Sequence, residues 1–392
     1  MGTRLADSAV ALRIEPAKTP ESGRMMSLDL FRGMTIAAMI LVNNPGNGFA
    51  YRPLEHADWN GWTPTDLIFP FFLFIVGVSM VLSFRTRMER GATRGDLLSH
   101  SLRRAAVIFA IGVALNAFPY HNVMPIRLPG VLQRIAVAYA FAAVIILWTK
   151  SRGRIVAVVA LLAGYWALMR FVPVPGFGVP GRDIPFMDPN RNLAAWLDRL
   201  MIPGKLYEVT RDPEGLLSTL PAIATALLGV LTGEWLRSEG RPRQKAAGMF
   251  VFGIAGLIAG KALDVWIMPI NKNLWTSSFV VFTAGFALVV LAACYWLVDV
   301  KGWRGWWTTP PVAFGMNAIG IYTLAMLVAK ALNDIHLTAY GQRMNLHGYV
   351  NERFYAPLAG PSMASLLYSL TFVSLSALVV YIAYRKKFFL KV

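Results

Sequence analysis

Ten long apolar stretches, separated by shorter polar segments, run along the 392-residue chain. A helix that crosses a bilayer needs about 20 mostly apolar residues. No stretch shows the period-two alternation of a membrane β-barrel strand. The pattern therefore predicts an all-α, polytopic transmembrane helix bundle of about ten spans. The predicted spans are 27–45, 64–84, 104–118, 130–149, 155–172, 215–236, 246–268, 275–298, 310–330 and 363–384.

The composition agrees with a membrane protein. Hydrophobic residues make up 56% of the chain and charged residues 15%, and the mean hydropathy is +0.50. A soluble domain cannot hide so much apolar surface, and roughly 25% of its residues are charged. The single cysteine, Cys294, excludes an internal disulfide framework and a multi-cysteine zinc site. Because no histidine or acidic cluster has metal-ligand spacing either, we expect no metal; the lipid bilayer is the first expected partner.

The distribution of lysine and arginine predicts the orientation, because these residues stay in cytoplasmic loops. With the N-terminus inside, 23 of them fall in cytoplasmic segments and 12 in outer segments, mostly in the long outer loops 171–214 and 331–362. We therefore expect an N-in, C-in bundle, with residues 1–24 as a cytoplasmic tail and 25–392 as the transmembrane domain. The net charge of +17 then reflects topology. Nucleic acid is not expected as a partner, because no basic patch interleaved with aromatic residues lies on a soluble module.

Two features predict binding at the cytoplasmic side. Asp29 and Arg32 lie three residues apart on one face of the first span, which suits either a structural ion pair or contact with a cosubstrate. The segment 85–104 carries six arginines. It is either a clamp for lipid headgroups or a docking surface for an anionic cosubstrate.

A short stretch before the second span concentrates polar and aromatic residues at the outer membrane interface. An aromatic interfacial belt and a helix cap, with Thr63 before Pro64, account for part of it. They do not account for His56, and histidine is the side chain that takes up and releases protons near neutrality. A catalytic histidine is therefore the sharper hypothesis. The residues of interest are His56, Trp59, Asn60 and Asp66, with Asn43 at the end of the first span.

Further candidates stand at the outer ends of two other spans. Arg127, Gln133 and Arg134 lie at the start of the fourth span, and Lys272 and Asn273 come directly before the eighth. An ionisable residue inside a membrane is costly and is a functional candidate by default. Each of these residues alone is also compatible with a purely structural role.

Several strings occur together in one order over about residues 24–330. Taken together, the chain resembles the membrane domain of the heparan-α-glucosaminide N-acetyltransferase family and its bacterial relatives. The strings that carry the resemblance are Ser27–Gly33 (SLDLFRG), Val42–Asn43, His56–Thr63 (HADWNGWT) with Asp66–Pro70 (DLIFP), Arg127–Arg134 (RLPGVLQR), Asp212–Gly215 (DPEG), Asn271–Trp275 (NKNLW), and Val298–Gly302 (VDVKG) with Gly315–Asn317 (GMN).

The resemblance implies acetyl transfer from cytosolic acetyl-CoA to an amino sugar or glycan across the membrane. It implies that His56 is the essential histidine and that Asn43 assists it. The bacterial cytoplasmic (inner) membrane is the implied location, and a homodimer stays open. Acetyl-CoA and the acceptor are expected to contact the remaining candidates: Asp29, Arg32, Trp59, Asn60, Asp66, Arg127, Gln133, Arg134, Lys272 and Asn273.

Acyl transfer from a thioester to an amine needs an unprotonated amine and a stabilised oxyanion. His56 would act as general base or as nucleophile, with Asn43, Asn60 and the Trp59 indole as oxyanion donors. A transporter is the main alternative, because polar residues in a ten-span bundle also suit a substrate pathway. No duplicated half or pair of broken helices supports it. A non-catalytic scaffold would leave His56 unexplained.

The charge distribution predicts that residues 85–104 face the cytoplasm and residues 45–63 the outside. In intact cells, a membrane-impermeant thiol reagent should therefore label Ala57→Cys and leave Gly91→Cys unlabelled. Labelling after permeabilisation controls for burial of either cysteine. The reverse pattern in intact cells would overturn the whole orientation.

Overall fold

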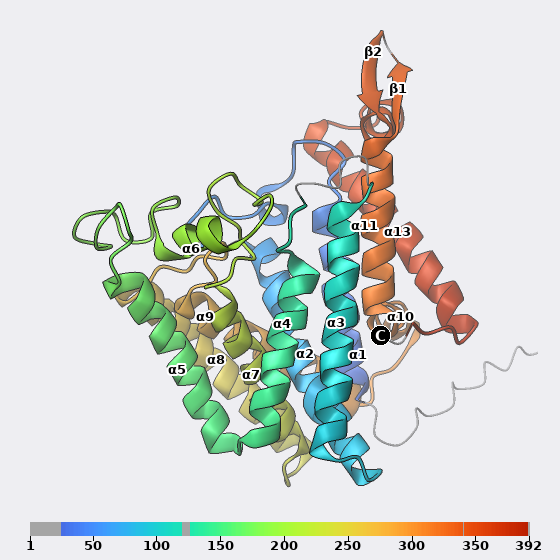
Figure 1. Ribbon diagram of the computed structural model, residues 1–392. Coiled ribbons are helices and arrows are strands. Elements are labelled where there is room, and N and C mark those ends of the chain that lie inside the picture. Colours follow the sequence, from blue (N-terminus) through green and yellow to red (C-terminus); the bar gives the residue numbers. More distant parts are fainter. Residues whose placement is uncertain (1–24, 120–125, 340, 391–392) are drawn as a thin grey trace, which may run out of the picture.

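The computed structural model describes residues 25–119, 126–339 and 341–390, so the predicted tail 1–24 lies outside the described residues. Within these ranges, nine helices are long and apolar enough to cross a membrane, which confirms a polytopic helical bundle (Figure 1). They are α1 Met26–Asn43, α2 Pro64–Glu89, α3 Arg94–Ala117, α4 Val131–Trp148, α5 Ser151–Phe171, α7 Thr219–Arg237, α8 Pro242–Trp266, α9 Ser277–Tyr295 with a π-helical extension Trp296–Val300, and α13 Pro361–Arg385.

The remaining elements are short or lie at the ends of the bundle. The α-helices are α6 Leu193–Met201, α10 Thr309–Met316, α11 Ala318–Asp334 and α12 Leu346–Val350; single turns of 3₁₀- or π-helix occupy Arg52–Leu54, Trp306–Thr308 and Asn351–Tyr355. One antiparallel hairpin, β1 His336–Ala339 with β2 Gln342–Asn345, pairs His336 with Asn345 and projects beyond the C-terminal end of α11 (Figure 1).

The span predicted at 310–330 is not one straight helix, because the chain bends there by 79° between α10 and α11. Asn317 stands at the bend with non-helical torsions (φ −118°, ψ 29°), and its side chain bonds the C-terminal segment, accepting from Leu390 N at 3.0 Å and donating to Phe388 O at 3.1 Å. The short helix α10 lies hard against α1: a Cβ on Gly33 would overlap the carbonyl of Pro311. Hydropathy alone could not distinguish this bent pair from one straight helix.

The predicted basic loop 85–104 and the short third span 104–118 also need correction. Helix α2 continues to Glu89 and α3 begins at Arg94, so only four residues connect them. The side chain of Thr93 accepts from Asp96 N at 3.2 Å, and the Asp96 carboxylate bonds back to Thr93 N at 2.9 Å, which is a capping box. Polar helical turns extend beyond the apolar part of a span, so a hydropathy window reports only the part that suits a bilayer.

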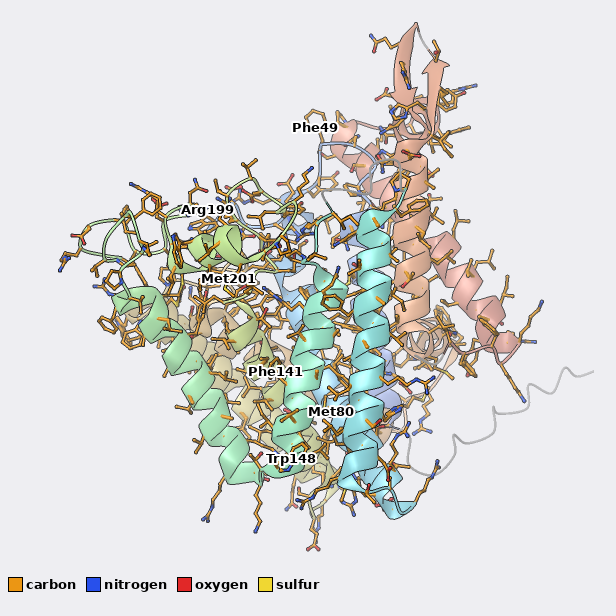
Figure 2. All side chains as sticks on the ribbon, viewed as in Figure 1. Phe49, Met80, Phe141, Trp148, Arg199 and Met201 are labelled. Carbon is orange, nitrogen blue, oxygen red and sulfur yellow. The ribbon has the colours of Figure 1, made fainter. Side chains whose placement is uncertain are left out.

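Helix α2 is the centre of the bundle. Three consecutive residues, Leu73, Phe74 and Ile75, are completely buried, so the helix is surrounded by neighbours, among them α1, α4, α7 and α9. Peripheral helices instead present apolar side chains outward, as Phe141 and Trp148 of α4 do in Figure 2. An apolar exterior around a tightly packed interior is what a bilayer solvent requires.

Close contact between α2 and α7 depends on glycine. A Cβ on Gly77 would lie 1.9 Å from the carbonyl oxygen of Ala226, whereas one on Gly164 of α5 would meet nothing within 4 Å. We expect Gly77→Val to force the two helices apart and to destabilise the fold by roughly 1–3 kcal/mol, the usual range for overpacking. Thermal unfolding of detergent-purified protein measures this. Gly164→Ala is the matched control, and equal melting temperatures for the two variants would contradict the packing argument.

Candidate active site

The site begins where the chain enters α2. Asp66 lies in the first turn of this helix and is fully buried. Its Oδ2 accepts hydrogen bonds from Thr63 N at 2.9 Å and Ala57 N at 3.1 Å. The expected helix cap is therefore present. It also folds the segment that carries His56 back against the start of α2.

The second oxygen of the same carboxylate holds the imidazole. Asp66 Oδ1 lies 2.7 Å from Nδ1 of His56, whose side chain is about half exposed (50%). A carboxylate only accepts hydrogen bonds, so Nδ1 carries the proton in this contact. The neutral ring then has its lone pair on Nε2, which is the arrangement that a general base or nucleophile needs.

The turn before α9, far away in the sequence, packs beside the Asp66–His56 pair. The buried Asn271 donates from Nδ2 to Trp59 O at 2.8 Å and to Asn60 Oδ1 at 3.2 Å, and Gly61 N donates to Ile270 O at 2.8 Å. The turn before α9 is thus fastened to the turn before α2. Asn271 was not among the sequence candidates, although it begins the NKNLW string.

These hydrogen bonds between the two turns place Lys272 in contact with His56. Lys272 Nζ lies 2.9 Å from Nδ1, 2.9 Å from Nε2, and 3.8 Å from Asp66 Oδ1. A hydrogen bond in line with the Nε2 lone pair would place Nζ much farther from Nδ1, so the equal distances put the ammonium over the ring. The contact of Lys272 with Nε2 is therefore not an in-line hydrogen bond. Burial, with the nearby charge of Arg134, lowers the pKa of Lys272.

The donors expected to form an oxyanion site are not assembled around His56. Trp59 Nε1 already donates to Met187 O at 3.0 Å, and its ring lies under the guanidinium of Arg211. Asn43 is an exposed residue at the end of α1, and no hydrogen bond among the described residues joins it to His56. Asn60 contacts the closing loop, and Asn273 is half-buried beside Lys272. Of the expected residues, His56, Asp66 and Lys272 form the cluster.

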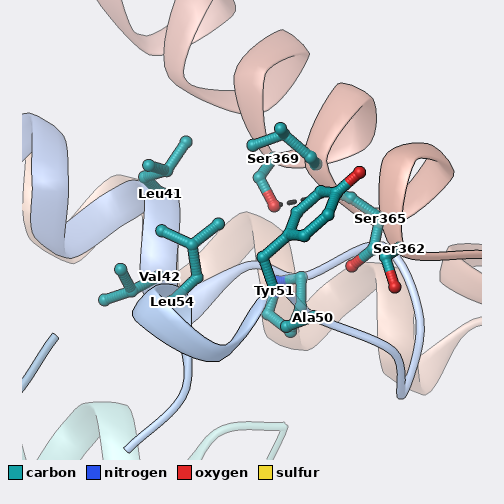
Figure 3. A pocket seen from close by; sticks show the side chains of 10 residues that line it. Leu41, Val42, Ala50, Tyr51, Leu54, Ser362, Ser365 and Ser369 are labelled. Carbon is teal, nitrogen blue, oxygen red and sulfur yellow. Dashed lines mark hydrogen bonds between the residues drawn. The ribbon is translucent and has the colours of Figure 1, made fainter. Parts of the chain in front are cut away.

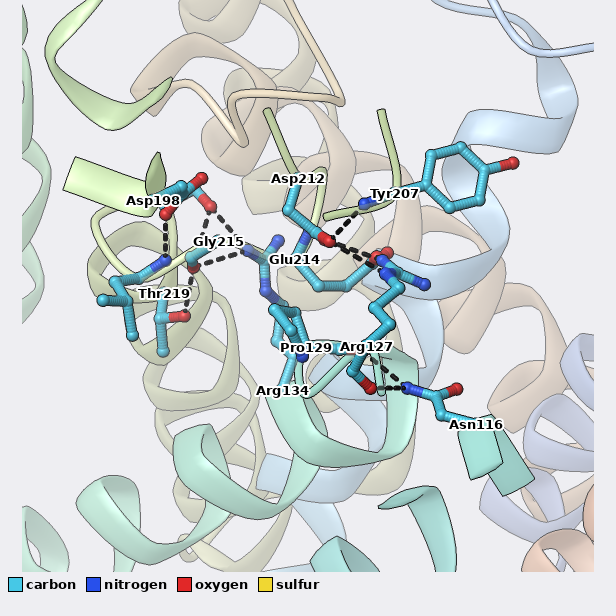
Figure 4. A network of polar contacts seen from close by, with 12 residues as sticks. Asn116, Arg127, Pro129, Arg134, Asp198, Tyr207, Asp212, Glu214, Gly215 and Thr219 are labelled. Carbon is cyan, nitrogen blue, oxygen red and sulfur yellow. Dashed lines mark hydrogen bonds and ion pairs between the residues drawn. The ribbon is translucent and has the colours of Figure 1, made fainter. Parts of the chain in front are cut away.

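A second polar network lies at the N-terminal end of α4 (Figure 4). Arg127 binds Asp212 through two hydrogen bonds, of 2.6 and 2.8 Å, and also pairs with Glu214. Burial alone would lower the pKa of Arg127, but the two carboxylates raise it above its usual value. Arg127 is thus a fixed charge that ties the segment before α7 to the start of α4.

Arg134 lies deeper in this network, and only part of its guanidinium group forms hydrogen bonds. Its Nη2 donates to Gly215 O at 3.1 Å and Ser218 Oγ at 2.5 Å, and its guanidinium lies over the Trp275 ring. The buried Nε and Nη1 of Arg134 have no hydrogen-bond partner among the described residues, and neither has Nε2 of Gln133. Unpaired donors in an apolar interior are costly, so these three nitrogens are suited to receive a ligand.

Asp29 and Arg32 form a separate cluster toward the other end of the bundle. Arg32 pairs with Asp29 at 3.0 Å and bonds Ser79 Oγ of α2 at 2.5 Å and Gly315 O of α10 at 3.4 Å. The expected ion pair is present and it joins three helices. Ser79 is about 20 Å from Asp66 along α2, at 1.5 Å per residue, so the sequence candidates divide between two places.

A small cavity lies between the C-terminal end of α1 and the N-terminal end of α13 (Figure 3). Its volume is about 10 Å³, room for one water molecule. As it stands it is too small for a sugar. The cavity is lined by Leu41, Val42, Pro45, Ala50, Tyr51, Leu54, Ser362, Ser365, Leu366 and Ser369.

The described residues contain no group of three histidine, cysteine or acidic side chains that suits a metal ion.

Comparison with known proteins identifies the family. The family model for the catalytic part of heparan-alpha-glucosaminide N-acetyltransferase matches residues 24–268. The mouse protein of that name is 32% identical over 353 residues, covering 77% of this chain and 53% of the mouse protein; the human protein is 32% identical over 351 residues, covering 76% and 52%. The chain thus spans about half the length of the curated relatives it matches. With the apolar helices described above, this match establishes an integral membrane protein that belongs to the heparan-α-glucosaminide N-acetyltransferase family.

Proposed function

We propose that the protein is a membrane-bound N-acetyltransferase of a bacterial cytoplasmic membrane. It takes acetyl from acetyl-CoA on the cytoplasmic side and gives it to the amino group of a sugar or glycan on the outer side. The observation that carries the proposal is the Asp66–His56–Lys272 cluster, which presents a lone pair on Nε2 at one end of the bundle. Membership of an acetyltransferase family favours transfer over transport.

The charge distribution supports the proposed sidedness. The end of the bundle with α6 lies opposite the end with the α2–α3 turn and the α7–α8 turn (Figure 1). His56 contacts Asp66 in the first turn of α2, at the end of that helix opposite the α2–α3 turn. Arginines and lysines are dense around those two turns, in 85–104 and 237–245, and such segments stay in the cytoplasm. His56 would then face the outside, where an extracytoplasmic glycan is accessible.

The proposed chemistry uses one base. Nε2 of His56 removes a proton from the acceptor amine as its nitrogen attacks the thioester carbonyl. The C–N bond forms, the tetrahedral intermediate collapses, the C–S bond breaks, and the proton passes from His56 to the departing thiolate. In the alternative route Nε2 attacks the thioester carbonyl, so that a bond to Nε2 forms, the C–S bond breaks and the thiolate leaves. The amine then attacks the acetyl-imidazole, the bond to Nε2 breaks, and the amine proton passes to the thiolate. Asp66 holds the ring in the productive tautomer in both routes.

Lys272 is the group we assign to the oxyanion. The Trp59 N–H is already used, whereas the Lys272 ammonium stands beside the reacting nitrogen. A fixed cation in a partly dry site stabilises the negative charge that develops on the carbonyl oxygen. We assign the free nitrogens of Gln133 and Arg134 to polar groups of the donor inside the bundle, and Arg32 to the donor's cytoplasmic part. No metal is needed in this scheme.

Replacing His56 tests the proposal directly. His56→Ala should reduce acetyl transfer to an amino-sugar acceptor by ~10²–10⁴-fold, the usual contribution of a general acid–base group. Acetyl-CoA binding, measured by calorimetry, should survive, because the donor's phosphates are held at the other end. His336→Ala, an exposed histidine on the hairpin, is the control. Normal turnover by a folded His56→Ala protein would refute the mechanism, and radiolabelled acetyl trapped on His56 would select the nucleophilic route.

Two substitutions of Lys272 test whether its positive charge is needed for turnover. Lys272→Met should lower kcat by about 10²–10³-fold, the range for loss of one oxyanion donor, with little change in the KM for the acceptor. Lys272→Arg keeps the charge and should recover part of kcat. Steady-state kinetics with purified protein measures both variants. If Lys272→Met raised KM and left kcat unchanged, Lys272 would bind the acceptor and would not stabilise the transition state.

A further inference from the structure

An open pocket of about 280 Å³ lies at the end of the bundle opposite His56. Its walls come from the start of α1 and from α2, α7 and α8. The apolar lining residues Leu82 and Leu236 belong to or pack on a hydrophobic core cluster, so the floor is fixed. The lining residues are Met25, Leu82, Arg85, Leu236, Arg237 and Lys245.

The three polar residues of this pocket are all cationic. Arg85 Nε pairs with Glu89 Oε1 at 2.9 Å, and Arg237 shares the same oxygen at 3.5 Å. Lys245 Nζ donates to Leu236 O at 2.9 Å and pairs with no carboxylate among the described residues. Three cations from three helices therefore converge with one shared carboxylate. The pocket carries a net positive charge beside an apolar wall.

We propose that this pocket binds the phosphate groups of an organic ligand from the cytoplasmic side. Guanidinium forks and an ammonium are the usual partners of phosphate, and the apolar wall suits the organic part attached to it. The shared chemistry has two sources: the nucleotide end of acetyl-CoA, or the headgroup of an anionic phospholipid. Assignment to the donor rests on the proposed function, whereas the phosphate site itself does not.

This location differs from the docking surface predicted on 85–104. Of the six arginines there, only Arg85 lines the pocket, and its two cationic partners come from α7 and α8. Arg104 instead lies over the ring of Tyr139 on α4. The site could not be found from one basic segment, because Arg237 lies 152 positions after Arg85 in the sequence.

Binding of a defined phosphate probe tests the site. Full-length protein in nanodiscs of neutral phosphatidylcholine is titrated with adenosine 3′,5′-bisphosphate by calorimetry. The double variant Arg237→Gln/Lys245→Gln should bind at least about tenfold more weakly, since hydrogen bonds to charged groups are the strong ones. Arg243→Gln is the matched control, because Arg243 is exposed in the first turn of α8 and does not line the pocket. Its affinity should be unchanged.

A lipid-binding measurement and an activity measurement distinguish the two possible sources of the phosphate group. Native mass spectrometry counts phosphatidylglycerol retained by the wild type and the double variant: loss of lipid with unchanged bisphosphate binding supports a headgroup site. A raised KM for acetyl-CoA at unchanged kcat supports the donor's nucleotide. If a folded double variant binds both probes like the wild type, the pocket is not a phosphate site. A wild type that binds bisphosphate but transfers no acetyl would refute the proposed function alone.

Discussion

One buried carboxylate holds the candidate active site together. Asp66 uses one oxygen to cap α2 and the other to hold His56, so the start of the central helix and the orientation of the imidazole are the same structural feature. A buried carboxylate is costly unless it is hydrogen-bonded, and both oxygens of Asp66 accept hydrogen bonds. The helix cap and the contact that orients His56 therefore belong to one structural feature of the segment 56–66. Each stabilises the other.

The same constraint extends to the turn before α9. That turn supplies Lys272 to the imidazole, and it ends at Trp275, a fully buried residue with a left-handed backbone (φ 52°). Such torsions are unfavourable for a bulky side chain and persist only where the surroundings enforce them. Here the indole donates to Thr225 Oγ1 at 3.1 Å and lies under Arg134. This strained turn therefore connects the His56 cluster, through Lys272 and Trp275, to the buried Arg134 side chain.

The sequence predicts this architecture where a local signal exists. Hydropathy identifies the nine long helices, and the Thr63-Pro64 cap with Asp66 follows from helix-terminus chemistry. The bend at Asn317 was missed because both halves are apolar. The contact of Lys272 with His56 joins residues 216 positions apart, and use of the Trp59 N–H by Met187 depends on a loop far along the chain. Neither follows from periodicity or spacing.

The two proposed sites lie at opposite ends of α2, the helix that is surrounded by other helices of the bundle. Asp66 and Arg85 are about 28 Å apart along this helix, at 1.5 Å per residue, which is close to the ~30 Å hydrocarbon core of a bilayer. A donor held by its phosphates at one end therefore has to extend through most of the membrane to place its thioester at the other. The nitrogens of Gln133 and Arg134 that have no hydrogen-bond partner among the described residues lie inside the bundle toward the His56 end, where an extended polar chain needs partners. In the proposed geometry the acetyl group would cross the membrane while the phosphates of the donor stay on the cytoplasmic side.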